Sequence, residues 1–181
     1  MKNARFFLFF LFFALGAFSG ALLDFPSPSP APAPSSSVTP LFFPGSEPEV
    51  RRLVDSANQS VYVTMYVFTY EPLAWSLIDA VERGVEVKVI LEPRLIGSSN
   101  PNLSMKELLE AHGVDVRWAS LSYPRTHSKT IVVDSKRVIV GSTNWSSHAM
   151  LLNREDALLV ADAKLASVFE EQFFEDWGKA V

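Results

Sequence analysis

The sequence contains no cysteine and only three histidines among its 181 residues. The absence of cysteine excludes a disulfide framework and any zinc site built on thiolates. Because the histidines are dispersed and the carboxylates show no clustered ligand spacing, we predict no metal or other cofactor. A formal net charge of -4 argues against a protein that coats nucleic acid through bulk positive charge.

The N-terminus combines two basic residues with a long apolar run. Lys2 and Arg5 precede residues 6–23, which carry no charge and are rich in Phe and Leu. This pattern is typical of a signal peptide or an N-terminal membrane anchor, and both interpretations of residues 1–23 stay open. Residues 24–40, rich in Pro, Ser and Ala, follow as an extended linker. We therefore predict an exported protein, secreted, periplasmic or membrane-anchored, with its folded domain outside the cytoplasm.

Residues 41–181 form the third predicted segment, a single α/β domain in which strands and helices alternate. Runs of β-branched and aromatic residues predict the strands, and apolar residues at helical spacing predict the helices. The expected strands are 61–69, 85–91, 114–118, 130–133, 137–140 and 157–160, and the expected helices include 73–81, one opened by Ser104 with Glu107, and one around 165–173. This alternation predicts a layered sheet flanked by helices.

Four polar residues are spaced so that they converge in a predicted β-hairpin. His127 and Lys129 are two apart in an extended stretch, so their side chains point to the same face. Ser142 and Asn144 have the same spacing on the returning strand. If residues 135–136 form the turn, Lys129 lies opposite Ser142 and His127 lies opposite Asn144. We expect this register, because a slip by one residue would break the match of faces.

The surroundings of this hairpin are basic. Residues 117–154 contain six Lys or Arg and one acid, Asp134, whereas the chain after residue 23 has 14 Lys or Arg against 20 Asp or Glu, a net of -6. Lysine supplies charge to phosphoryl oxygens, and Ser and Asn donate hydrogen bonds to them. The hairpin is therefore our candidate phosphate site.

The spacing within this segment resembles the HKD signature of the phospholipase D superfamily. The motif residues read His127-x-Lys129, four residues, Asp134, six residues, Gly141-Ser142-x-Asn144. Similarity at residues 43–45, 61–66 and 83–89 extends the resemblance over roughly 41–178. It implies a phospholipase D-like or nuclease fold, with a mixed sheet flanked by helices on both faces and one HKD motif per chain. The third segment, 41–181, would then be the catalytic domain.

The resemblance also implies roles for the polar residues of the site. His127 would be the nucleophile that attacks phosphorus to give a phosphohistidine intermediate, which water then resolves. Lys129 and Asn144 would hold the phosphoryl oxygens, assisted by Ser142. Glu155 would orient and polarise the histidine.

Two further motif residues, Asp134 and Gly141, are expected to be structural. Asp134 is predicted at the turn end of the hairpin, away from His127, where aspartates commonly bond local backbone.

The chemistry of the family needs a second histidine to protonate the leaving oxygen. His112 precedes a helix-ending glycine and is expected to cap that helix, and His148 lacks a lysine two residues on. We therefore predict a homodimer in which two copies of His127 share one active site.

The substrate stays open between two phosphodiester classes. We favour a metal-independent endonuclease on DNA or RNA, single-stranded for preference, with Trp118, Tyr123 or Trp145 as stacking surfaces. The alternative is a phospholipase D that hydrolyses phospholipid head groups, which a membrane location would favour. A non-catalytic dimeric nucleic-acid-binding module is the third hypothesis, and the complete set of site residues argues against it.

Overall fold

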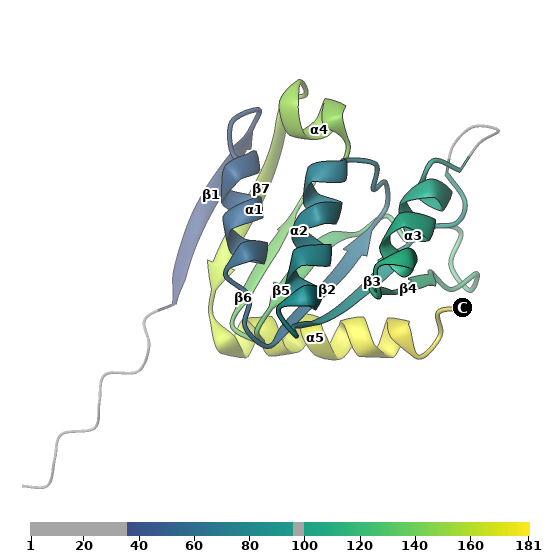
Figure 1. The fold of residues 1–181 in the computed structure, drawn as a ribbon. Helices are drawn as coiled ribbons and strands as arrows, with labels where there is room; N and C mark the ends of the chain where they lie inside the picture. The colour runs from purple at the N-terminus through teal and green to yellow at the C-terminus, as the bar shows by residue number, and fades with distance from the viewer. Residues whose placement is uncertain (1–35, 96–99) are drawn as a thin grey trace, which may run out of the picture. The chain divides into compact units, whose positions relative to one another are not determined.

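Seven strands form one mixed sheet in residues 36–95 and 100–181, the part of the chain that the computed structural model describes. The predicted signal or anchor at 1–23 lies outside these residues, as does most of the predicted linker. Across the sheet the strand order is β1-β7-β6-β5-β2-β3-β4 (Figure 1). The strands are β1 (Ser37–Phe43), β2 (Ser60–Met65), β3 (Glu86–Leu91), β4 (Asp115–Trp118), β5 (Lys129–Val133), β6 (Arg137–Gly141) and β7 (Glu155–Ala161).

Helices cover both faces of this sheet (Figure 1). Three helices, α1, α2 and α3, pack on one face, α5 crosses the other, and the short α4 contacts β1. Their bounds are α1 (Glu47–Asp55), α2 (Glu71–Glu82), α3 (Asn102–Ala111), α4 (Ser147–Leu151) and α5 (Ala163–Trp177). The predicted α/β architecture, a mixed sheet flanked by helices on both faces, is confirmed. None of the helices within the described ranges is long and apolar enough to cross a membrane.

Alternation along each strand divides the interior into two cores. In β2, the buried Val61, Val63 and Met65 join the cluster beneath α1, α2 and α3, whereas Tyr62 joins the cluster beneath α5. Ile131 of β5 belongs to the first cluster and Val132 to the second. Since side chains two apart share a face, Lys129 projects to the same side of the sheet as Ile131.

The strand directions make the two ends of the sheet different. We call these ends edges, meaning the ends of the strands and not the outer strands β1 and β4. β2, β3 and β4 are parallel, and β5, β6, β7 and β1 follow antiparallel to their neighbours. The carboxyl ends of β2, β3, β4 and β6 therefore meet the beginnings of β5 and β7 at one edge, which we call the Lys129 edge. The opposite edge carries the turn between β5 and β6, and we call it the Asp134 edge.

The hairpin register differs from the predicted one. Thr130 pairs with Val140 and Val133 with Arg137, so the prediction that placed Lys129 opposite Ser142 and His127 opposite Asn144 is wrong by one residue. The turn contains three residues rather than two, because Asp134 and Ser135 both adopt left-handed conformations, with φ of 54° and 51°. The ladder also ends at Gly141, so the polar residues beyond it need not follow strand alternation.

Strand β1 begins inside the predicted linker 24–40. It pairs with β7 along its whole length, from Ser37 opposite Ala161 to Phe43 opposite Glu155. Its last residues, toward the Lys129 edge, include the buried Leu41 and Phe43. Backbone pairing, rather than composition, thus places residues from Ser37 onward in the sheet.

Candidate active site

His127 and Lys129 contact each other at the Lys129 edge, where β5 begins. Lys129 Nζ lies 2.9 Å from His127 Nδ1 and donates to the carbonyl oxygen of His127 at 2.6 Å. The same ammonium lies 3.3 Å from His127 Nε2, and a positive charge this close to both ring nitrogens disfavours a second positive charge on the imidazole. The contact therefore favours the neutral imidazole, which is the nucleophilic form.

The surroundings of His127 favour the same protonation state. Burial lowers the pKa of His127, and the positive charges of Lys129 and Arg125 lower it further. The ring of Tyr66, directly after β2, packs against the imidazole with the two ring centroids 4.3 Å apart. Sequence reasoning missed Tyr66, because an aromatic residue after a β-branched run is typical of an ordinary strand.

Lys129 is itself buried, with 7% of its surface exposed. Burial lowers the pKa of Lys129, and the carboxylate of Glu155 opposes that shift. No salt bridge to Lys129 forms among residues 36–95 and 100–181. A desolvated ammonium without a paired carboxylate attracts an anionic group strongly.

A second group of contacts joins Ser142 to Glu155. Ser142 Oγ donates to one carboxylate oxygen at 2.5 Å, and Asn153 Nδ2 donates to the other at 3.2 Å. Within the described residues Glu155 has no hydrogen bond to His127, so the orienting contact expected of it is not formed in this chain. Its charge acts on Lys129 instead.

Gly141 allows this second group to form. A Cβ atom at this position would lie 2.4 Å from the carbonyl oxygen of Asp156 and 2.5 Å from the Cα of Ala157. Only glycine therefore lets the ends of β6 and β7 approach closely, and that approach brings Ser142 to Glu155.

Asn144 lies beyond β6 at the same edge. Its Oδ1 is buried and has no hydrogen-bond partner among the described residues. The next residue, Trp145, is 3% exposed, and its ring meets Phe68 edge-on. Trp145 N also donates to the carbonyl of Val67 at 2.9 Å, which anchors the segment that carries Asn144 to the end of β2.

The aromatic candidates for base stacking are thereby reduced to one. Trp145 is buried and cannot stack on a ligand, and Trp118 is half-buried with Lys106 Nζ 5.8 Å from its ring centroid. Tyr123 is 50% exposed and lies in the loop that leads to His127.

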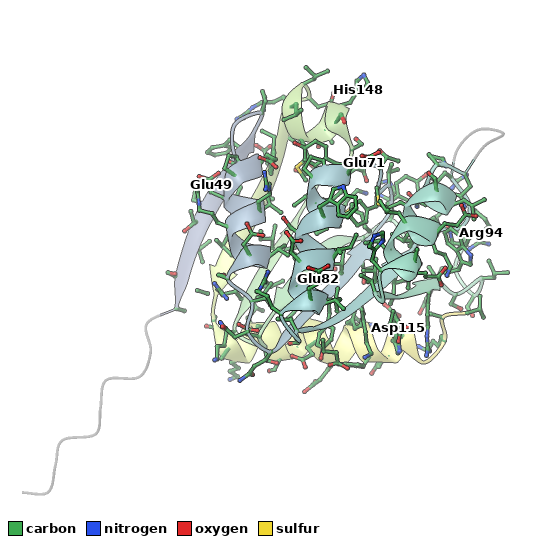
Figure 2. The ribbon with its side chains drawn as sticks, viewed as in Figure 1. Glu49, Glu71, Glu82, Arg94, Asp115 and His148 are labelled. Carbon is green, nitrogen blue, oxygen red and sulfur yellow. The ribbon has the colours of Figure 1, made fainter. Side chains whose placement is uncertain are left out.

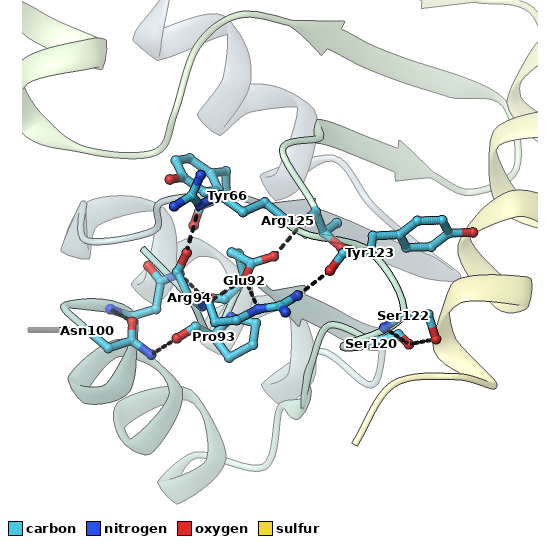
Figure 3. A network of polar contacts seen from close by, with 11 residues as sticks. Tyr66, Glu92, Pro93, Arg94, Asn100, Ser120, Ser122, Tyr123 and Arg125 are labelled. Carbon is cyan, nitrogen blue, oxygen red and sulfur yellow. Dashed lines mark hydrogen bonds and ion pairs between the residues drawn. The ribbon is translucent and has the colours of Figure 1, made fainter. Parts of the chain in front are cut away.

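A buried polar network that sequence reasoning missed supports that loop (Figure 3). Glu92 follows β3 and is 0% exposed. One of its oxygens accepts from the backbone N–H of Arg94 at 2.8 Å, and the other accepts from the backbone N–H of Thr126 at 2.5 Å. The carboxylate thus fixes the residue immediately before His127 to the end of β3.

Asn102, at the start of α3, completes this network. Its amide nitrogen donates to the carbonyls of Tyr66 at 2.8 Å and Glu92 at 3.1 Å, and its oxygen accepts from Phe68 N at 2.8 Å. Asn102 therefore holds the ends of β2 and β3 together beneath the site. The partners of Glu92 and Asn102 are backbone groups distant in the sequence, so no spacing pattern announces them.

Asp134 lies at the other edge of the sheet, away from His127. Its Oδ1 accepts from the backbone N–H groups of Asn58, Gln59 and Ser60 at 3.1, 2.8 and 3.1 Å. Burial alone would raise the pKa of Asp134, but these backbone donors and Arg137 outweigh it and hold the pKa below its usual value. The bonds are long-range rather than local, and they tie the hairpin turn to the start of β2.

No group of three or more His, Asp or Glu side chains that could hold a metal ion occurs in the described part of the chain. What the Lys129 edge does bring together is His127, Lys129, Ser142, Asn144 and Glu155, all predicted from the sequence, with Tyr66 and Glu92 beside them. This set offers a nucleophile, a buried cation and neutral hydrogen-bonding groups.

Comparisons with known proteins point to one family. The model described as "Cardiolipin synthase, PLD-like domain" matches residues 50–177. A phospholipase D of Rickettsia bellii is 30% identical over 145 residues, which cover 78% of this chain and 68% of that protein. A mitochondrial cardiolipin hydrolase of Mus musculus is 31% identical over 142 residues, covering 76% and 62%.

A solved structure gives the same assignment. Nuc from Salmonella typhimurium, a phospholipase D family member, matches with a TM-score of 0.75 and 28% identity, covering 81% of this chain and 97% of Nuc. The matched region includes every residue of the His127–Glu155 site. The resemblance seen in the sequence is thus confirmed, and the chain belongs to the phospholipase D superfamily of phosphodiester hydrolases.

Proposed function

We propose that the protein hydrolyses phosphodiesters without a metal, through a phosphohistidine formed on His127. The observation that carries this proposal is the contact between the imidazole of His127 and the buried ammonium of Lys129. In the first step a ring nitrogen bonds to phosphorus while the bond to the leaving oxygen breaks. Water then attacks phosphorus, the P–N bond breaks, and the ring is regenerated.

The remaining site residues would stabilise the charge that develops on the phosphoryl oxygens. Lys129 supplies the positive charge, and the Asn144 amide and the Ser142 hydroxyl offer hydrogen bonds. Glu155, held by Ser142 and Asn153, keeps negative charge close to Lys129 and so favours its protonated form.

The proton for the leaving oxygen would come from a second copy of the chain. His112 caps α3, with its Nδ1 2.9 Å from the Leu108 carbonyl oxygen. His148 is exposed on α4 (Figure 2) and, within the described residues, makes no hydrogen bond to His127. A homodimer that places two His127 side chains at one shared site would supply the missing acid.

We propose a nucleic acid, single-stranded for preference, as the substrate. Two features support it: the exposed Tyr123 in the loop that leads to His127, and the correspondence of this domain with 97% of the Nuc chain. Phospholipid is the second candidate, favoured by the names of the relatives, phospholipase D and cardiolipin hydrolase. The N-terminal segment would export the domain or hold it at a membrane, where either substrate could be met.

Assays on a substrate panel test the proposal. Purified protein is incubated with single-stranded DNA, RNA, duplex DNA and cardiolipin or phosphatidylcholine vesicles, with and without EDTA. We expect EDTA-resistant cleavage of single-stranded nucleic acid, and loss of at least about a thousandfold in His127→Ala, since the nucleophile is removed.

His112→Ala serves as the matched control and should retain activity within about twofold, because its ring only caps α3. Full activity of His127→Ala, or loss in EDTA that a metal restores, would contradict the mechanism. Cleavage of lipid alone would move the assignment to the phospholipid alternative. An active monomer in light scattering would contradict the shared site.

A further inference from the structure

The cations of the predicted basic region do not form one face. Four of the six are held by other partners or lie in the Asp134 turn, and Lys129 belongs to the site itself. Only Arg125 remains beside His127 as an additional positive charge. These four residues are Arg117, which donates to the Trp177 carbonyl, Arg137 beside Asp134, Lys136 in the same turn, and Arg154 beside Asp156 and the Phe42 ring.

Arg125 is exposed and held in place by one backbone group. Its Nε donates to the carbonyl oxygen of Arg94 at 3.3 Å, so the side chain reaches from the His127 segment to the chain that follows β3 (Figure 3). Its Nη1 and Nη2 make no hydrogen bond or ion pair to residues 36–95 and 100–181. The guanidinium is therefore oriented, charged and open to an anion at the edge of the site.

The nearby acid does not neutralise Arg125. Glu92 is fully buried, and its two oxygens are taken by the Arg94 backbone, the Arg94 Nε at 3.4 Å and the Thr126 backbone. Arg94 itself lies beside α3 (Figure 2) and pairs with this carboxylate. The charge of Arg125 is left for a ligand.

Arg94 also holds the segment that precedes Arg125. Tyr123 is two residues before Arg125, half of its surface is exposed, and its carbonyl accepts from the Arg94 guanidinium. Arg94 thus fixes both ends of the segment, through its carbonyl to Arg125 and through its side chain to Tyr123. Figure 3 shows the Tyr123 ring directed away from the Arg125 guanidinium, so the fixed cation alone is the candidate contact for a phosphate of single-stranded nucleic acid.

We infer that Arg125 binds the phosphate group adjacent to the one that His127 attacks. The ligand is a single-stranded oligonucleotide with at least two consecutive phosphodiesters. This inference rests on the proposed nuclease function, and it gives that function a subsite outside the HKD motif.

Trinucleotides with one neutral linkage test the subsite. The substrates carry either two phosphodiesters or one phosphodiester and one methylphosphonate, placed in turn on the 5′ and 3′ side of the cleavable linkage. Rates are measured at the pH of maximal wild-type activity, where kcat/KM changes least with a small shift in the pKa of His127. We expect wild type to lose about tenfold in kcat/KM with one of the two neutral isomers, since a charge-assisted contact is removed.

Arg125→Ala should lose about tenfold on the all-phosphate trinucleotide and show no further loss with that isomer, because the contact is already absent. Lys136→Ala, which removes the same charge at the Asp134 edge, is the matched control and should behave as wild type. Equal losses of Arg125→Ala on every trinucleotide, or none on any, would overturn the subsite alone. If wild type cleaves no trinucleotide but hydrolyses phospholipid through His127, the nuclease function itself fails, and the subsite with it.

Discussion

At the Asp134 edge, the buried carboxylate of Asp134 joins a hairpin turn to the start of β2. At the Lys129 edge, the buried carboxylate of Glu92 joins the end of β3 to the segment before His127. Asp134 is met by three backbone donors and by Arg137, and the groups around it are satisfied. The Lys129 edge instead keeps a buried ammonium without a salt bridge and the unpartnered Asn144 Oδ1 within the described residues. Satisfied polar groups stabilise a fold, whereas groups left open are available to a ligand.

The largest effect should come from breaking the Asp134 edge. Asp134→Ala leaves three backbone N–H groups without their acceptor, so we expect the free energy of unfolding to fall by about 3 kcal/mol. The activity of the molecules that remain folded should stay close to wild type, because this edge is remote from His127. Chemical denaturation gives the first quantity, and kcat per folded molecule gives the second.

Two comparisons sharpen this prediction. Asp115→Ala removes an exposed carboxylate on the same edge (Figure 2) and should change stability by less than about 0.5 kcal/mol. Because the pKa of Asp134 is lowered in the fold, its stabilisation is present above about pH 4 and is lost as the pH falls through the lowered value. The gap between wild type and Asp134→Ala should therefore narrow in acid, and a constant gap would contradict the role of the ionised carboxylate.

Breaking the Glu92 network should affect catalysis more than stability. In Glu92→Gln, the amide group must turn its NH₂ toward either Thr126 N–H or Arg94 N–H, so one hydrogen bond is lost and the His127 segment loosens. We expect kcat to fall about tenfold with KM nearly unchanged, as for a misplaced catalytic group. Steady-state kinetics on a single-phosphate dinucleotide separate the two constants.

Glu86→Gln is the matched control, since Glu86 lies at the opposite end of the same strand and contacts only Tyr62 and Lys88 through its side chain among the described residues. It should keep the wild-type kcat. If Glu92→Gln changes KM alone, or changes stability without changing kcat, Glu92 does not position His127.

The comparison of the two edges also explains what the sequence could predict. The strands and the converging residues of the HKD segment follow from β-branched runs and from alternation, which are local properties. The register of the hairpin is set by Asp134 and Ser135 in left-handed conformations, and these depend on backbone donors from residues 58–60. Such long-range partners leave no mark on the local pattern.

The same reason accounts for the elements that were misplaced. Ser104 and Glu107 match a capping box, yet α3 already begins at Asn102, and Ser104 Oγ donates to the Pro101 carbonyl from within the helix. No role was predicted for Asn102, yet its side chain is fully buried in the network beneath the site. Helices α1 and α4 were not predicted, because each is short and is stabilised mainly by tertiary contacts rather than by its local sequence.

The smallest effect, and the finest test of the open Lys129 edge, is the pH dependence of activity. The attacking His127 must be neutral while its copy is protonated, so kcat/KM should follow a bell-shaped pH profile whose acid limb reports the pKa of the attacking His127. Burial, Lys129 and Arg125 all lower that pKa, and the acid limb should lie below the ordinary histidine value of about 6.5. Arg125→Gln removes one of these charges and should move the limb toward higher pH by a few tenths of a unit. Because Arg125 is exposed, this difference should shrink in 1 M salt, where the Debye length is about 3 Å. An acid limb that does not move at low salt would mean that the charge of Arg125 does not affect the pKa of the imidazole.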